Sequence, residues 1–157
     1  MILMKEISYG VLAVLLGLVS FWDIKKRIIP NKYVLSIFCL KIIFLVSCFF
    51  EDRGYFKQQL VLSITGLFIS GFFTLMCRLF SKEGIGIGDI KLLWVLGFFL
   101  GTEMFLFSLV ITSVISFITA LIFVFIKKSG GKERLPFAQF ISLGTAASML
   151  SEILTGE

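Results

Sequence analysis

Two aspartates, Asp23 and Asp89, lie where a long apolar run meets a polar segment. Asp23 ends the first apolar run, and the following Pro30 and Asn31 favour a break before the next helix. Asp89 follows three glycines in residues 83–93, EGIGIGDIKLL, and opens another apolar run. Two carboxylates in contact share one proton, because both cannot ionise easily. Such a pair can hydrolyse a peptide bond by activating water and polarising the carbonyl group.

The composition excludes several other kinds of chemistry. The chain has no His, which removes Ser-His-Asp and Cys-His catalysis and most catalytic zinc sites. Cys39, Cys48 and Cys77 lie in apolar runs without a CxxC pair, as packing residues do. The run GIGIG is not a GxGxxG motif, since Asp89 takes its last position. We therefore expect no metal and no cofactor.

The elements that must position the two aspartates are membrane helices. The chain is 58% hydrophobic and only 16% charged, with a mean hydropathy of +1.03, which is typical of a polytopic membrane protein. We predict an all-α fold and one membrane-embedded domain over residues 1–157. The six predicted transmembrane helices are 7–22, 33–50, 60–80, 90–101, 103–126 and 136–154. As one helix, 90–126 would be about 55 Å long, so we expect a turn at Gly101–Glu103.

The distribution of positive charge predicts the orientation in the membrane. Most of the 15 basic residues fall in alternate loops, at 25–32, 78–91 and 127–134. The positive-inside rule places these loops in the cytoplasm and both termini outside. Asp23 and Asp89 then lie on the same, cytoplasmic side. This orientation also explains the net charge of +5, and no basic stretch interleaved with aromatic residues indicates a nucleic acid.

Three ordered motifs in the chain resemble those of the type IV prepilin peptidase family, the GxGD aspartic proteases. The first is an Asp followed seven residues later by Pro-Asn, the second is GxGDxKL at residues 86–92, and the third is a Pro-Phe pair before the last helix. The residues of this chain that match the motifs are Asp23, Pro30, Asn31, Gly86, Gly88, Asp89, Lys91, Pro136 and Phe137. The resemblance covers nearly the whole chain.

The resemblance implies that Asp23 and Asp89 are the catalytic pair of a membrane aspartic endopeptidase. Its implied partner is a type IV prepilin or pilin-like secretion subunit, whose leader peptide is cleaved at the cytoplasmic face of the inner membrane, just before the hydrophobic helix. Glu83 or Glu133 would attract the basic leader. Longer members carry an N-terminal region with paired CxxC motifs, linked to methylation; without it, we expect no methyltransferase activity. Gln139 replaces the second proline of the family's PFxPxL pattern.

Other functions compete with this interpretation. A presenilin-type protease shares GxGD, but its first Asp lies in a YD motif, whereas Asp23 follows Trp22. A small transporter or channel would explain Lys41 within an apolar run, although no inverted repeat is visible. A Ser-Lys dyad of Lys41 with Ser36 or Ser47 has poor helical spacing. A non-catalytic relative is disfavoured because both aspartates are present.

Overall fold

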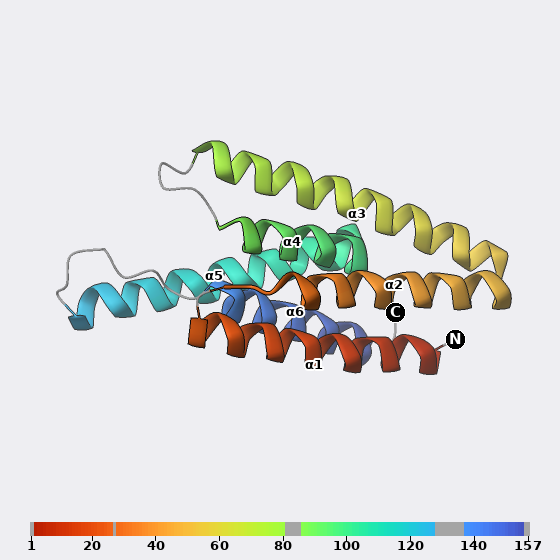
Figure 1. Ribbon diagram of the computed structural model, residues 1–157, viewed down its shortest axis with the longest axis horizontal. Helices are drawn as coiled ribbons and strands as arrows, with labels where there is room; N and C mark the ends of the chain where they lie inside the picture. Colours follow the sequence, from red (N-terminus) through yellow and green to blue (C-terminus); the bar gives the residue numbers. More distant parts are fainter. Residues whose placement is uncertain (1, 27, 81–85, 128–136, 156–157) are drawn as a thin grey trace.

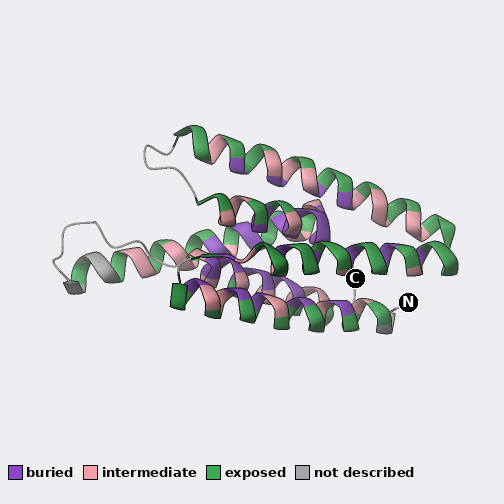
Figure 2. Cartoon of the chain, in the orientation of Figure 1, coloured by how far each residue is buried: buried purple, intermediate pink, exposed green. Residues whose placement is uncertain are grey.

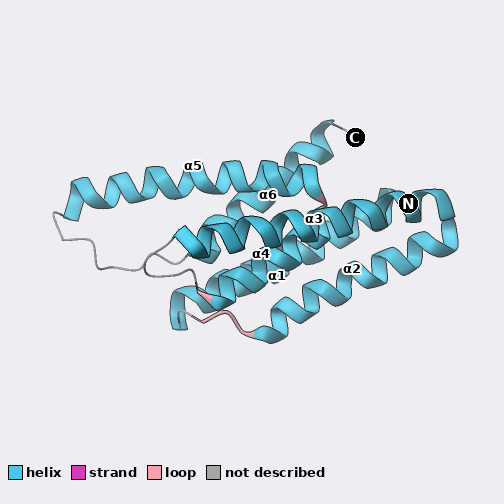
Figure 3. Ribbon diagram, turned by 90° about the horizontal axis from the view of Figure 1, so that it is seen from above, coloured by secondary structure: helices cyan, strands magenta, loops and turns pink. Residues whose placement is uncertain are grey.

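Six helices make up most of the part of the chain that the computed structural model describes, residues 2–26, 28–80, 86–127 and 137–155 (Figure 1). Successive helices run in opposite directions along one bundle, and the two chain ends lie near the same end of it (Figures 1 and 3). The helices are α1 (Ile2–Lys26), α2 (Asn31–Glu51), α3 (Arg53–Phe80), α4 (Ile87–Leu100), α5 (Thr102–Lys127) and α6 (Phe137–Thr155).

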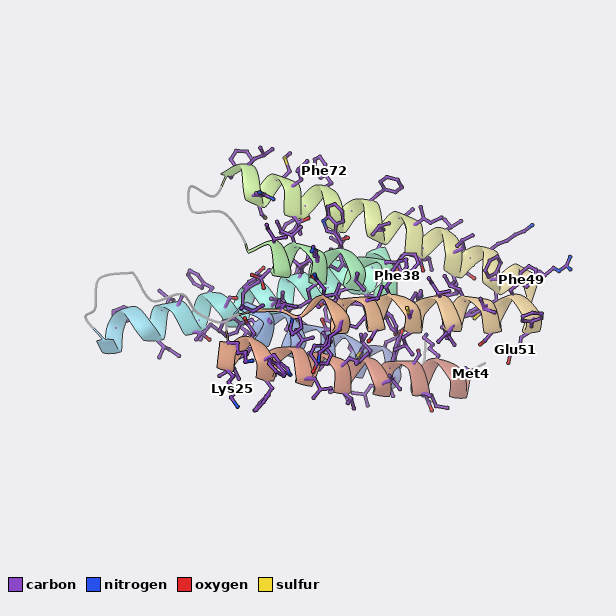
Figure 4. All side chains as sticks on the ribbon, in the orientation of Figure 1. Met4, Lys25, Phe38, Phe49, Glu51 and Phe72 are labelled. Atoms are coloured by element: carbon purple, nitrogen blue, oxygen red, sulfur yellow. The ribbon has the colours of Figure 1, made fainter. Side chains whose placement is uncertain are left out.

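Five of these helices are long and apolar enough to cross a membrane: α1, α2, α3, α5 and α6. Large apolar side chains cover the outside of the bundle, such as Phe72 on α3 and Phe117 on α5, which are 67% and 64% exposed (Figures 2 and 4). A surface of this kind is unfavourable in water but suits contact with lipid chains. The protein is therefore a multi-pass membrane protein with an all-helical architecture.

The fourth predicted transmembrane helix, 90–101, corresponds to α4, and its role as a span is not confirmed. α4 has 14 residues, so it is about 21 Å long, whereas a bilayer core is about 30 Å thick. It packs against α2, α3 and α5. Every residue from Leu96 to Leu100 is buried. An apolar segment that is buried on all sides belongs in the interior of a bundle, and the second half of α4 takes that place, whereas Trp94 is 44% exposed.

The predicted turn at Gly101–Glu103 is confirmed. α4 ends at Leu100, α5 begins at Thr102, and Gly101 between them has a φ of 78°. Glycine adopts positive φ without steric cost. The Gly101 N–H also donates to the Gly97 carbonyl oxygen at 3.1 Å, which satisfies an end carbonyl of α4.

Small residues allow close packing between neighbouring helices. On α3 and α4, Gly66 and Gly97 face each other so closely that a Cβ atom on either would collide with the other's backbone. On α5 and α6, the Ser108 and Thr145 hydroxyls lie 3.1 Å apart within the buried interface. Such contacts supply the packing and polar interactions that hold helices together in lipid, where the hydrophobic effect between them is weak.

Candidate active site

Asp23 lies in the last turn of α1, and its side chain is only 8% exposed. Its Oδ2 accepts a hydrogen bond from the backbone N–H of Ala138 at 3.2 Å. Ala138 is the second residue of α6, so its N–H has no acceptor inside that helix. The positive end of α6 therefore stabilises a negative charge on Asp23.

Asp89 lies in the first turn of α4. Gly86 lies directly before α4, with a φ of −56° and a ψ of 137°. Its carbonyl oxygen accepts the Ile90 N–H at 3.2 Å. A Cβ atom at Gly86 would lie 3.0 Å from Asp89 Oδ2. Glycine at this motif position thus leaves the room that the Asp89 carboxyl group occupies.

The two aspartates interact electrostatically. Asp89 lies outside the five candidate membrane spans. Burial, and secondly the negative charge of Asp23, raise the pKa of Asp89 to about 6. The two predicted carboxyl groups, from residues 66 positions apart in the sequence, are thus near enough in the fold for one charge to act on the other.

The contact between Ile29 and Gly88 joins the two motifs. Ile29, in the connection between α1 and α2, is 8% exposed. A Cβ atom at Gly88 would lie 3.1 Å from the Ile29 Cβ. The absent side chain therefore lets the first turn of α4 pack directly on this connection. Pro30 follows Ile29 with a φ of −67° and a ψ of 129°, and it ends the connection because α2 begins at Asn31.

A second link runs along the surface of the site. Lys91 Nζ donates a hydrogen bond to Asn31 Oδ1 at 3.2 Å, and both residues are exposed. Each belongs to a different predicted motif, so this bond connects the start of α2 with the start of α4.

The third predicted motif is only partly within the described residues. Phe137 begins α6 and packs against the hydrophobic core, whereas Pro136 lies outside the described residues. Gln139 lies in the first turn of the helix. Sequence reasoning missed the backbone N–H of Ala138, although the position of this motif just before a helix is a signal for a free N-terminal donor.

Other predicted sites have different outcomes. Glu83 and Glu133, proposed to attract the leader, lie outside the described residues. Ser36 and Ser47 donate their hydroxyl groups to carbonyl oxygens one turn earlier in α2, and neither pairs with Lys41. Within the four described ranges, no group of three or more Cys, Asp or Glu side chains is arranged to hold a metal ion.

Comparison with known proteins supports the interpretation drawn from the motifs. The model of the type IV leader peptidase family matches residues 10–124, which include Asp23 and the GxGDxKL motif. No curated protein and no solved structure gives a significant match. Since the family match covers more than half of the chain, this protein belongs to the type IV leader peptidase family.

Proposed function

We propose that this protein is a membrane aspartic endopeptidase that removes the leader peptide of type IV prepilins or pilin-like proteins. The observation that carries the proposal is the electrostatic interaction of Asp89 with Asp23. Asp89 lies in the first turn of α4, and Asp23, in the last turn of α1, accepts a backbone N–H from the N-terminus of α6. Family membership supports the peptidase activity and the class of substrate. No metal or cofactor is part of the proposed reaction.

The surroundings of the two carboxyl groups favour different roles for them. Asp23 accepts the N–H of Ala138 at the positive end of α6, so we assign it the role of base. Asp89, with its raised pKa, carries the shared proton. Asp23 takes a proton from water as the water oxygen bonds to the scissile carbonyl carbon, and Asp89 protonates the carbonyl oxygen. When the C–N bond breaks, the proton on Asp23 passes to the leaving amine and Asp89 regains its own.

The charges at the two ends of the bundle support an active site on the cytoplasmic side. Lys25 and Lys26 lie at the same end as Asp23, and Glu51 and Asp52 lie at the opposite end, near Met4 (Figure 4). The positive-inside rule assigns the lysine end to the cytoplasm. Both termini then lie outside, and the leader is cut at the cytoplasmic face.

A groove between α2 and α4 suits the start of the hydrophobic helix of the substrate. It has a volume of about 370 Å³ and is lined by Asn31, Lys32, Val34, Leu35, Phe38, Lys91 and Val95. Its walls are apolar, and Lys91 at one end is two residues from Asp89. Lys32 and Lys91 repel a basic leader. The mature apolar segment therefore occupies the groove, and the leader extends away from it.

The decisive experiment is processing of a pilin precursor by the protein in a bacterial membrane. We expect a product shortened at the boundary between the leader and the apolar helix, identified by mass spectrometry of its new N-terminus. If every pilin precursor from the same genome stays intact, the proposal is contradicted. Cleavage at scattered positions within the apolar helix would instead favour a presenilin-type protease.

A bulky residue in the groove should weaken substrate binding. Leu35 is 61% exposed and lines the groove, so Leu35→Trp fills space that the substrate needs. We expect KM to rise about tenfold with kcat little changed, because contacts made equally before and during reaction are lost. Ile43→Trp is the matched control, since Ile43 is 64% exposed on the same helix but does not line the groove. Equal kinetics in the two variants would place the substrate elsewhere.

The pH dependence of cleavage should report the proton on Asp89. The pKa of Asp89 is about 6, so its protonated form prevails at lower pH and is lost as the pH rises. We expect kcat/KM to fall roughly tenfold or more between pH 6 and about pH 7.5. The corresponding fall in kcat should occur at higher pH, because bound substrate buries Asp89 further. A kcat/KM that stays constant over this range would rule out Asp89 as the acid.

A further inference from the structure

A polar cavity lies at the end of the bundle opposite to Asp23 and Asp89. Its volume is about 110 Å³, and residues from all six helices line it, including Tyr9, Lys41, Gln59, Thr102 and Glu152. It therefore has room for roughly three or four water molecules or for one small polyatomic ion. The proposed peptidase reaction uses none of these residues.

Lys41 is the unusual member of this cavity. Its side chain is only 4% exposed, and its Nζ lies 5.3 Å from the centre of the Phe44 ring and 5.5 Å from that of Phe99. No hydrogen-bond acceptor or carboxylate within the described ranges pairs with this Nζ. The faces of two aromatic rings compensate a buried ammonium group only in part. An ionisable residue in a membrane interior commonly marks a functional site.

The nearby carboxylate of Glu152 already has two partners. Glu152 Oε1 lies 2.7 Å from Lys5 Nζ, and Glu152 Oε2 accepts the Tyr9 hydroxyl at 2.6 Å. The other acid that lines the cavity, Glu103, has an exposed side chain. Glu152 acts on Lys41 only through its longer-range charge, so an anion from outside the chain can provide the direct contact.

The N-terminus of α5 supplies a second attraction for an anion. Thr102, Glu103 and Met104, the first three residues of this 26-residue helix, all line the cavity. The N–H groups of a first helical turn have no acceptor within the helix, and the helix dipole makes this end positive. Tyr55 and Gln59 on α3 also line the cavity and offer hydroxyl and amide donors.

We propose that this cavity binds a phosphate group between Lys41 and the N-terminus of α5. A phosphate carries several acceptor oxygens, which suit a cation and helix N–H groups converging from different helices. The cavity lies at the end of the bundle that holds both chain termini, beside the first residues of α3 and α5. Two sources can supply this group, the phosphate of a lipid headgroup and free inorganic phosphate, and the test separates them.

The test measures the thermal midpoint Tm of the intact protein in phosphate-free maltoside detergent. One arm compares sodium phosphate with sodium chloride at equal ionic strength, and the other compares phosphatidylglycerol with a galactolipid that lacks phosphate. We expect phosphate or phosphatidylglycerol to raise Tm by about 3 °C or more through binding to the folded state. A rise in one arm alone identifies the source, and no rise in either arm overturns the proposal.

Variants of two lysines make the test specific. Lys41→Met should abolish the rise in Tm, whereas Lys57→Met, at an exposed position on α3, should keep it. A rise that persists in Lys41→Met overturns the proposal. If Lys41→Met does not fold, Lys41→Gln replaces it. If neither variant folds, native mass spectrometry of the wild-type protein decides the question. Equal retention of phosphatidylglycerol and the galactolipid, together with no retained inorganic phosphate, would overturn the proposal.

Discussion

Asp23→Asn and Asp89→Asn should each reduce the rate of leader cleavage by about three orders of magnitude. An amide can neither take a proton from water nor give one to the carbonyl oxygen, and a positioned acid or base contributes about 10²–10⁴-fold. Loss of either group removes the division of roles within the pair, so the double variant should be little slower than each single one. Cleavage is measured as the ratio of processed to intact precursor over time.

The structure indicates that these two variants will still fold. An Asn at position 23 keeps an oxygen that can accept the Ala138 N–H. At position 89, a neutral amide removes the cost of burying a carboxylate near Asp23. Asp52→Asn is the matched control, because Asp52 lies at the other end of the bundle, where its Oδ1 accepts the Gly54 N–H at 2.7 Å. Cleavage within tenfold of wild type in either active-site variant would exclude the proposed pair.

The sequence predicted the helix ends near Asp23 and Asp89 better than the contacts between those helix ends. Local signals sufficed for the break before Asn31 and for the helix that opens around Asp89, since glycine and proline act within a few residues. The contact of Ile29 with Gly88 depends on how α4 sits in the bundle. The hydrogen bond from Ala138 to Asp23 comes from the backbone, which carries no residue-type signal.

The number of membrane spans shows another limit of sequence reasoning. Hydropathy describes how apolar a run is, but lipid and a protein interior favour the same residues. Hydropathy alone therefore does not decide whether residues 90–101 form a short span, and the helix they form packs against α2, α3 and α5. In the same way, Lys41 was visible as an isolated charge, but the cavity around it exists only once all six helices are assembled.

Gly97→Ala should be the most destabilising single-methyl change in the described part of α4. The new Cβ would lie 2.6 Å from the Gly66 carbonyl oxygen and would collide with the Ser70 side chain. A backbone carbonyl cannot rotate away, so α3 and α4 must separate. We expect a loss of about 2–3 kcal/mol in the free energy of unfolding. Unfolding in detergent, followed by circular dichroism, measures this loss.

Gly17→Ala provides the matched comparison, since a Cβ at Gly17 in α1 meets nothing within 4 Å. That variant should be unchanged or up to about 1 kcal/mol more stable, because alanine favours the helix. Equal stability of the two variants would mean that α3 and α4 are not in close contact.

The same substitution tests what positions Asp89. α4 carries Asp89 in its first turn and contacts α3 through Gly97, about two turns later. If contact with α3 positions the carboxyl group, Gly97→Ala should slow cleavage in the folded protein as well as lower stability. Adding Ser70→Gly removes one collision but leaves the Gly66 carbonyl, so we expect partial recovery of both properties. Unchanged cleavage in Gly97→Ala, despite its lower stability, would show instead that contacts at the first turn, such as Gly88 with Ile29, position Asp89.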